Sequence, residues 1–402
     1  MLSKITKKRK IKNGSLKAVT YIASFFSILV IIGIFAFSFI KGIGGLNIKM
    51  LTSDYYEQAY FAKVVLKDET YNHECEEGEF FSSRWGIAFK DDFDLEKKEC
   101  VVISYIDPSS PFTDARDSKD VRIKVEVNQL VRRIQCKNDE SNFVLTTKNK
   151  AQNMIETLDK VDVINEFYYC TLGGGIRGSL VSTLYLILLT LVIALPIGIL
   201  AALYLGNYAK DTKIIRLIRS MIDMISGIPS IIFGLIGSLI FIPFVSSFSG
   251  VKGNSILAGA FTLAIMLLPI IIKNTEESIK EIPSSYKHAS LALGASETQT
   301  TFKVILPNSI EGILTSTLLS IGRIIGESAA LIFVMGSSIQ DDINIFKGAT
   351  SLAVHIFLLI SGEEPNYASA CAISLIILSI VLILNILLKL VCRKLKRFEV
   401  QR

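Results

Sequence analysis

The chain has 402 residues, half of them hydrophobic, and carries a formal net charge of +6 at pH 7. Its mean hydropathy is +0.47. The apolar residues fall into runs that reach the bilayer length of about 20 residues rather than being spread as a soluble core requires, which excludes a soluble globular protein.

Six apolar runs are predicted to cross the membrane as helices: residues 19–40, 180–205, 221–245, 256–272, 310–335 and 368–391. A further apolar stretch, residues 351–361, is too short to cross and is expected to lie at the interface or to dip into the membrane. The first run is too long for a cleavable signal peptide and lacks a small-residue cleavage site after it.

Lysine and arginine indicate how the predicted spans are oriented. They gather in residues 1–18, in the loop 209–220, in the loop 273–309 and in residues 392–402. Cytoplasmic loops carry an excess of these residues, so the N-terminal tail 1–18 and the C-terminal tail 392–402 are predicted to be cytoplasmic. The sequence therefore predicts a multi-pass protein of the cell membrane with residues 42–176 outside.

The outer segment 42–176 differs from the rest of the chain because it is net acidic. Strand-like runs at 99–107 and 121–136 predict a folded domain that contains β-structure. It holds Cys75, Cys100, Cys136 and Cys170. In an oxidising compartment two disulfides among them are plausible, and ordinary buried thiols are the alternative.

Several kinds of chemistry have no signal in the sequence. There is no GxxxxGK[ST] phosphate loop, so no nucleotide cofactor is expected to bind this chain. The three histidines lie far apart in sequence, and no spacing indicates a metal site or a nucleophile beside its base. We expect no catalytic residue, no metal and no nucleic-acid partner, and an enzyme is the weaker reading.

The loop 273–309 is predicted to be cytoplasmic and to fold as a helix, a short helix, a turn and a helix. Pro283 breaks the first helix, and Ser285 is a candidate cap for the second. Gly294 permits a tight bend, and Pro307 suits the first turn of the next span. The short helix carries an apolar ridge of Ala289, Ala292, Leu293 and Ala295. A groove on a partner would cover it; the alternative is that it packs on the chain's own span ends.

This loop, "HASLALGASETQTTFKVILP", resembles the coupling loop of ABC importer permeases. The family pattern is Glu-Ala-Ala, three residues, Gly, nine residues, Ile, one residue, Leu-Pro. Ala289, Gly294, Leu306 and Pro307 are in register. His288 replaces the glutamate that usually forms a salt bridge to the ATPase in this family. The resemblance implies contact with the ATPase through these matching positions and their neighbours: His288, Ala289, Leu293, Gly294, Ala295, Leu306 and Pro307.

The stretches 196–210, 227–237 and 322–336 resemble phosphate-specific transport permeases, of the PstA type more than the PstC type. The resemblance implies the all-α type I ABC importer fold with six transmembrane helices, five of them in a core domain 177–391. It also implies inorganic phosphate as substrate, two ATP-binding subunits that use the ATP, a second permease of PstC type and an extracellular phosphate-binding protein. It does not cover residues 41–170.

Two pairs of residues are candidates for the translocation path or gate. Arg323 and Glu327 lie in an apolar run four residues apart, so they are predicted to pair, and a guanidinium suits a tetrahedral oxyanion. A structural ion pair is the alternative. Pro229 and Ser230 interrupt the third predicted span, where irregular backbone lines a cavity or is a packed kink.

Two other functions stay open at this point. One is a permease for another oxyanion or a small solute, because an arginine in the membrane does not discriminate among anions. The other is a sensor or adhesion protein in which the outer domain works and the spans only anchor it in membrane lipid. The intact spacing of the coupling loop favours the importer over an anchor.

Overall fold

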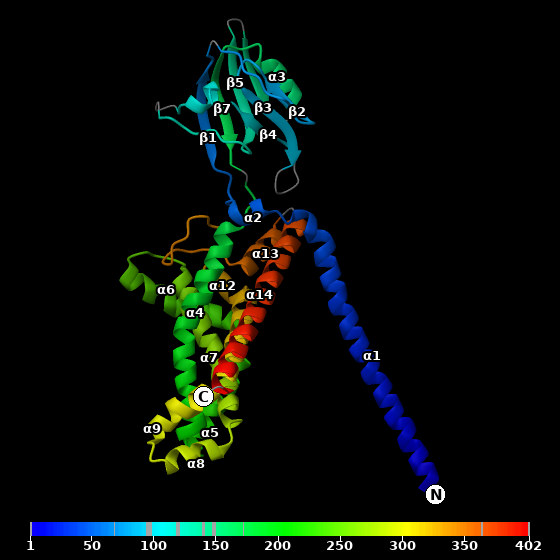
Figure 1. Cartoon of the computed structure of the whole chain (residues 1–402), viewed down its shortest axis with the longest axis vertical. Coiled ribbons are helices and arrows are strands. Elements are labelled where there is room, and N and C mark those ends of the chain that lie inside the picture. Colours follow the sequence, from blue (N-terminus) through cyan, green and yellow to red (C-terminus); the bar gives the residue numbers. More distant parts are fainter. Residues whose placement is uncertain are drawn as a thin grey trace.

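The computed structural model describes residues 2–67, 69–93, 99–117, 121–138, 141–146, 150–171, 173–362 and 365–400. It consists of a helical bundle and a separate β domain, joined at one end of the bundle beside the short helix α2 (Ile48–Thr52) (Figure 1). Residues 1, 401 and 402 of the predicted tails lie outside the described residues.

The first helix, α1 (Leu2–Gly42), diverges from the bundle along most of its length (Figure 1). It meets α14 (Tyr367–Val400) near Gly42, where an added Cβ would lie 2.7 Å from the backbone carbon of Cys371. Its apolar part, which with the following turn covers Lys17–Gly45, is not buried against the rest of the described chain over its most apolar stretch. Such a helix requires lipid or a partner around it.

The centre of the bundle is the pair α4 (Arg177–Leu203) and α7 (Ile256–Lys280). Their backbones approach closely because Gly198 has no side chain: an added Cβ would lie 2.5 Å from Cγ2 of Ile271. Around this pair pack α6 (Ser230–Ser249), α11 (Ile310–Gly326), α12 (Ala329–Val334) and α13 (Leu352–Ser361).

Five helices in the described residues are long and apolar enough to cross a membrane, and a sixth is reached if a broken pair counts as one span. That pair, Glu297–Asn308 and Ile310–Gly326, is bent by 62°. The helix expected over 256–272 extends to Lys280. The multi-pass membrane character is confirmed, whereas the boundaries of the third and fifth predicted spans are wrong.

The third predicted span, 221–245, begins inside a different helix. Helix α5 (Lys213–Ser226) carries charged residues such as Arg219 and Asp223 between its apolar ones, and it ends before Pro229. The apolar helix α6 starts only at Ser230. Proline is suited to the residue just before or at the start of a helix and not to its interior, so the chain breaks there and α5 is separate from the span.

The β domain is a seven-stranded antiparallel sheet in the order β1-β7-β5-β4-β3-β2, with β6 paired to β5. The strands are β1 (Ala59–Val65), β2 (Glu79–Ser82), β3 (Ile87–Phe93), β4 (Glu99–Ile106), β5 (Leu130–Asn138), β6 (Ser141–Thr146) and β7 (Val163–Cys170). The predicted run 99–107 corresponds to β4. The run 121–136 is wrong in its first half, because Asn128 turns with a φ of 70° and β5 begins only after it.

Helix α3 (Ala151–Leu158) covers one face of this sheet. Between them lies a core that includes the fully buried Trp85, Phe89 and Phe112. The indole of Trp85 donates a hydrogen bond of 2.9 Å to the carbonyl of Leu158, which satisfies its only polar atom. The domain therefore has its own core, separate from that of the bundle.

The predicted disulfides are not formed: Cys75, Cys136 and Cys170 are free thiols, so no two of the four cysteines of the domain are joined. Cys136 lies in the core between sheet and helix, whereas Cys100 and Cys170 belong to a small cluster with Val102 and Leu130. Cys75 is exposed in the connection between β1 and β2.

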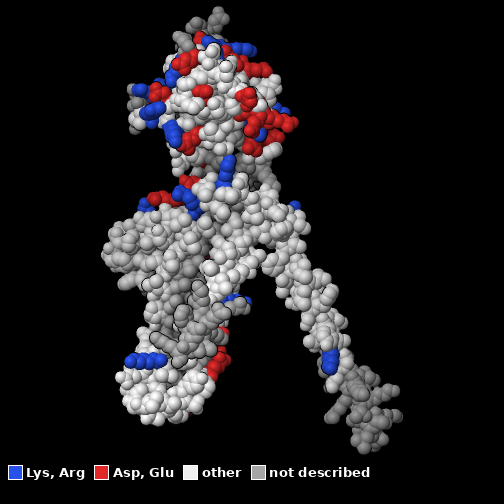
Figure 2. All heavy atoms as spheres, viewed as in Figure 1, with Lys and Arg blue, Asp and Glu red and all other residues white. Residues whose placement is uncertain are grey.

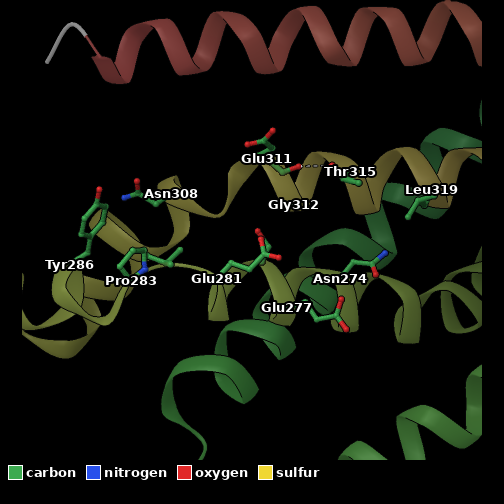
Figure 3. A pocket seen from close by; sticks show the side chains of 12 residues that line it. Asn274, Glu277, Glu281, Pro283, Tyr286, Asn308, Glu311, Gly312, Thr315 and Leu319 are labelled. Atoms are coloured by element: carbon green, nitrogen blue, oxygen red, sulfur yellow. Dashed lines mark hydrogen bonds between the residues drawn. The ribbon is translucent and has the colours of Figure 1, made fainter. Parts of the chain in front are cut away.

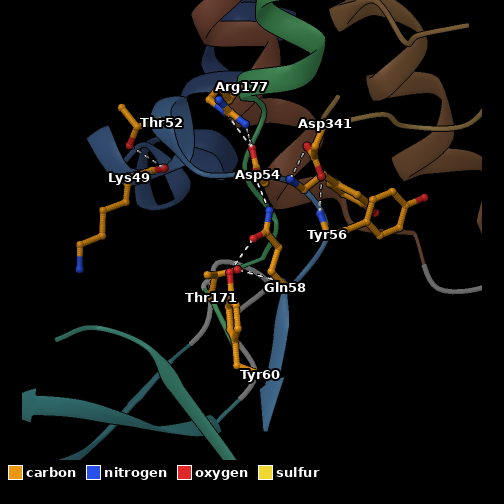
Figure 4. A network of polar contacts seen from close by, with 10 residues as sticks. Lys49, Thr52, Asp54, Tyr56, Gln58, Tyr60, Thr171, Arg177 and Asp341 are labelled. Atoms are coloured by element: carbon orange, nitrogen blue, oxygen red, sulfur yellow. Dashed lines mark hydrogen bonds and ion pairs between the residues drawn. The ribbon is translucent and has the colours of Figure 1, made fainter. Parts of the chain in front are cut away.

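The two chain segments that enter and leave the β domain are fixed to the bundle by a polar network (Figure 4). The carboxylate of Asp341 accepts hydrogen bonds from the backbone N–H groups of Tyr55 and Tyr56, at 2.8 and 2.9 Å. Arg177, at the start of α4, forms an ion pair with Asp54. The network ties the domain to the first turn of α4 and to the loop after α12.

Charge is distributed unevenly over the molecule. Figure 2 shows basic and acidic residues over the β domain and at both ends of the bundle, with an almost uncharged middle between them. A belt without charge is what the hydrocarbon region of a bilayer requires.

Candidate functional site

The predicted coupling loop forms a helical hairpin at the end of the bundle opposite the β domain (Figure 1). Helix α8 (Ser284–Ala292) follows Pro283, which is its N-cap residue. The expectation that Ser285 caps this helix is wrong, because the helix already includes Ser284 and no side chain makes the cap hydrogen bond. Gly294 turns the chain with a φ of +85°, a conformation that favours glycine.

The chain after the turn starts with a capping box. Ser296 and Gln299 exchange side-chain and backbone hydrogen bonds of 3.2 and 3.0 Å at the start of α9 (Glu297–Thr300). A π-helical turn over Thr301–Ile305 leads into α10 (Leu306–Asn308). Pro307 lies in this short helix and not in the first turn of the next span as expected, because α11 begins only at Ile310. The sequence therefore specifies both the turn and the restart of the helix.

The apolar ridge of α8 faces away from the chain. Leu293 is 90% exposed, and Ala289, Ala292 and His288 are also exposed. Ala295 is half-buried. The alternative that the ridge packs on the chain's own span ends is contradicted for Leu293, whose side chain has almost no cover. The hairpin presents small and apolar side chains outward, as a helix that docks in a groove does.

The fifth predicted span is interrupted at Glu327, and the predicted pairing with Arg323 is wrong. Helix α11 ends at Gly326, and Glu327 is extended with φ −79° and ψ 124°. Its carboxylate instead accepts a hydrogen bond of 3.2 Å from the backbone N–H of Ala330, in the first turn of α12. Glu327 is buried and stabilises the start of that helix, where an acidic group is favoured by the helix dipole.

Arg323 lies exposed on α11, next to a surface that no other helix of the described chain covers. Gly322 and Gly326 are exposed on the same helix, and an added Cβ at either would meet nothing within 4 Å. A guanidinium at membrane depth is costly against lipid. This face of α11 is therefore suited to a water-filled path or to close contact with a second helix.

The break before α6 lies beside the break before α12. Pro229 is exposed and Ser230 is half-buried, one turn before Gly234. An added Cβ at Gly234 would lie 2.7 Å from Cα of Ala330, so the first turns of the two helices touch through their backbones. The structure thus brings two irregular segments from different predicted spans together, a placement that sequence spacing alone does not reveal.

A cleft of about 540 Å³ opens between α7 and α11 at their ends near α8 (Figure 3). Three carboxylates, those of Glu277, Glu281 and Glu311, line it together with Tyr286 and Asn308. Sequence analysis missed this acidic cleft because the three glutamates lie on two segments that are separated in the chain by the coupling hairpin. Within the described residues, no group of three or more His, Cys, Asp or Glu side chains is placed to hold a metal ion.

Ion pairs between α5 and α7 form a second feature that sequence analysis missed. Arg219 pairs with Glu276 at 2.9 Å, and Asp223 pairs with Lys273 at 2.6 Å. Glu276 is buried and also forms an ion pair with Lys280, four residues further along α7, at 2.7 Å. These pairs connect the amphipathic helix α5 to the central helix α7.

Comparison with known proteins agrees with this architecture. The family of binding-protein-dependent transport system inner membrane components matches residues 194–397. The chain is 35% identical over 198 residues to a probable ABC transporter permease, YqgI, of Bacillus subtilis, covering 46% of this chain and 66% of that protein. It is 34% identical over 227 residues to the phosphate transport system permease protein PstA of Yersinia pestis, covering 56% of this chain and 75% of that one.

Among solved structures, the inward-facing MetNI methionine ABC transporter aligns with a TM-score of 0.43 at 23% identity. The alignment covers 55% of this chain and 95% of that one. The family match, residues 194–397, leaves the β domain outside it.

Proposed function

Because this chain belongs to the family of binding-protein-dependent transport system inner membrane components and is a permease of the PstA type, we propose that it imports inorganic phosphate as one half of an ATP-driven transporter. In this proposal the chain forms part of the path and binds no nucleotide itself. A separate ATPase supplies the energy through the hairpin that contains α8.

The observation that carries the proposal is the exposed hairpin. A nearly bare Leu293 beside Gly294, at the tip of a bundle that is otherwise suited to lipid, needs a partner. Burying a leucine side chain contributes about 1.5–3 kcal/mol of favourable free energy. Burial of Leu293 in a groove of the ATPase would therefore stabilise the complex of the two proteins. A chain that only anchors an outer domain has no use for such a surface.

The proposed assembly has two ATP-binding subunits, a second permease of PstC type and an extracellular phosphate-binding protein. The uncovered face of α11 with Gly322, Arg323 and Gly326 supports a second permease at the path. The apolar surface of α1, unburied within this chain, supports the same conclusion. Membrane lipid would cover the rest of the almost uncharged middle of the bundle.

The proposed orientation places the hairpin and both termini in the cytoplasm and the β domain outside. In Figure 1 the hairpin and both ends of the chain lie at one end of the molecule, and the β domain lies at the other. This arrangement is compatible with the excess of basic residues in the tails and in the loops of that end.

Phosphate is proposed on two grounds. Several relatives bear the name phosphate transport system permease protein PstA, among them those of Yersinia pestis and Haemophilus influenzae. Arg323 offers a fork of donors that matches a tetrahedral oxyanion. Because Glu327 caps α12 and does not pair with Arg323, the guanidinium of Arg323 is exposed on the face of α11 that would line the path.

The β domain is proposed to shield or to form part of the dock for the binding protein. Its attachment supports this role, because the network around Asp341 holds it to the end of the bundle where substrate would enter. Residues Ala59 and Cys170 are paired at the base of the domain, so a short linker can replace everything between them. Unchanged uptake and unchanged docking of the binding protein after this deletion would contradict the role.

The test is uptake of labelled phosphate at low external concentration by cells with the wild-type chain, no chain, or Gly294→Pro. Proline cannot adopt the positive φ of Gly294. Gly250→Pro is the matched control: Gly250 has a φ of +70°, ends α6 and likewise has nothing near its Cβ position. We expect phosphate uptake to be lost without the chain and in Gly294→Pro, to persist in Gly250→Pro, and sulfate uptake to persist throughout.

Unchanged phosphate uptake in cells without the chain would reject phosphate as the substrate. Equal loss in both proline variants would reject the assignment of the hairpin as the coupling element. Loss of sulfate uptake in place of phosphate uptake would redirect the proposal to another oxyanion.

A further inference from the structure

Two π-helical turns meet at the inner end of the bundle. One, Tyr204–Tyr208, ends α4, and the other, Thr301–Ile305, follows the coupling turn. The side chain of Asn207 in the first donates a hydrogen bond of 2.5 Å to the hydroxyl of Thr301 in the second. Thr301 is fully buried. Isolated π turns are rare and occur frequently at functional sites, so two that bond to each other indicate a specific contact.

Lys287 of α8 reaches the same point. Its ammonium group donates to the side-chain oxygen of Asn207 at 2.7 Å and to the backbone carbonyl of Asn207 at 3.4 Å. The last carbonyls of a helix have no partner inside the helix, and the helix dipole favours a cation there. Arg219 of α5 caps the neighbouring carbonyl of Leu205 at 2.8 Å. The inner end of α4 is therefore held by two cations that come from other helices.

A second polar contact joins α8 to the chain after the turn. The hydroxyl groups of Ser290 and Thr300 lie 2.9 Å apart. Lys287 and Ser290 are three residues apart and both half-buried, whereas Ala289 and Leu293 are exposed. The helix thus has one face for its own chain and another face for a partner.

Behind this contact the chain is closely packed. An added Cβ at Gly206 would lie 3.2 Å from Cγ2 of Ile279 on α7, and Gly198 touches Ile271 of the same helix. Close-packed elements transmit a displacement because they have little room to adjust. A movement of the end of α4 is therefore passed to α7.

We propose that Lys287, Asn207 and Thr301 form the joint that transmits movement of the coupling helix to α4. This inference rests on the proposed function and names the route by which the work of the ATPase enters the spans. When a partner displaces α8, Lys287 carries Asn207 with it, because separation leaves carbonyl oxygens at the end of α4 without donors. The three residues are positioning residues: none of them needs to touch substrate or nucleotide.

The test measures phosphate transported per ATP hydrolysed by the complete transporter in proteoliposomes. The variants are Lys287→Met, which keeps the length of the side chain but removes its donors, and Asn207→Ala. Lys287→Arg restores a cation, and Lys213→Met is the matched control, since Lys213 is an exposed lysine in the first turn of α5. Recovery of the ATPase subunits with the purified chain monitors assembly for every variant.

Disruption of the joint is expected to lower the ratio of transport to hydrolysis about tenfold in Lys287→Met and in Asn207→Ala, within the range of coupling between sites in proteins. ATP hydrolysis and assembly are expected to persist. Lys287→Arg should recover most of the ratio, and Lys213→Met should match the wild type. The double variant should have a ratio no lower than that of the more impaired single variant, because the two residues act as one unit.

An unchanged ratio in Lys287→Met would overturn the inference, and so would loss of the ATPase subunits from that variant, which would make Lys287 a docking residue. Additive losses in the double variant would also overturn it. Failure of the proposed function gives a different result: the wild-type transporter itself would hydrolyse ATP without moving phosphate.

Discussion

A single methyl group at Gly234 should destabilise the contact between the two broken spans. In Gly234→Ala the new Cβ would lie 2.7 Å from Cα and from the carbonyl oxygen of Ala330. Carbon atoms need about 3.5–4.0 Å, so the first turn of α12 must move by about 1 Å. Backbone atoms cannot rotate away as a flexible side chain can, and α12 is tied at that point by the cap from Glu327.

The magnitude follows from two opposing effects. Overpacking of a closely packed contact costs about 1–3 kcal/mol. Alanine in place of glycine inside a helix contributes about 1 kcal/mol in the other direction. The net loss is therefore up to about 2 kcal/mol, and each kcal/mol lowers the Tm by about 2–4 °C for a unit of 150–250 residues.

The assay is thermal unfolding of the purified chain, followed by intrinsic fluorescence or by loss of the folded fraction. Gly322→Ala is the matched control, because Gly322 lies in α11 and nothing is within 4 Å of its Cβ position. We expect a lower Tm for Gly234→Ala and an unchanged or slightly higher Tm for Gly322→Ala. A Gly234→Ala chain as stable as the control would refute the close approach of α6 and α12.

Three further predictions concern the other parts of the molecule. Leu293→Asp should leave the Tm of the isolated chain unchanged, because the side chain is 90% exposed, but should abolish co-purification of the ATPase subunits. Electrophoretic mobility should be the same with and without reductant, since Cys75, Cys136 and Cys170 are free thiols; a shift would contradict this. The hydroxyl and backbone N–H of Ser109 hold the pKa of Asp107 below its usual value, so the stability that this carboxylate contributes is present above its unfolded pKa and lost as pH falls through its lower folded pKa. Urea titrations of Asp107→Asn should lack that component of the acid sensitivity, and an unchanged pH profile would contradict it.

The sequence predicts the bundle because bilayer-length apolar runs and basic loops are properties of local composition. The coupling turn is also local: Gly294 and the capping box at Ser296 are sufficient to specify it. The disulfides could not be decided, because cysteine count does not reveal which sheet face each side chain occupies. Cys136 lies on the helix-covered face and Cys100 in the cluster that excludes it.

The break at Glu327 was missed, and the break at Pro229 was expected only as an interruption within one span, because apolar character continues across each break. In the third predicted span Pro229 divides an amphipathic helix from an apolar one, and hydropathy alone joins them. In the fifth predicted span, the spacing of Arg323 and Glu327 favours an ion pair on one helix. Glu327 instead accepts a hydrogen bond from the backbone N–H of Ala330 and caps α12. Tertiary contact decides between these outcomes.

The joint around Asn207 was also beyond sequence analysis. Lys287 lies 80 residues from Asn207 in the chain, and no local pattern predicts their contact. Thr301, the other partner of Asn207, is a common residue type, and its hydroxyl accepts this hydrogen bond only because two helix ends meet in the fold. The sequence did predict the position of α8, because the turn that follows it is recognisable from Gly294.

The most direct test of the account is phosphate uptake into proteoliposomes that hold this chain with its permease partner and ATPase, supplied with binding protein and ATP. We predict uptake of labelled phosphate that requires ATP hydrolysis, is not displaced by excess sulfate, and is lost in Arg323→Gln while ATPase assembly persists. Uptake that is independent of ATP, or undiminished in Arg323→Gln, would contradict the central claim that the exposed guanidinium of α11 lies on an ATP-driven phosphate path.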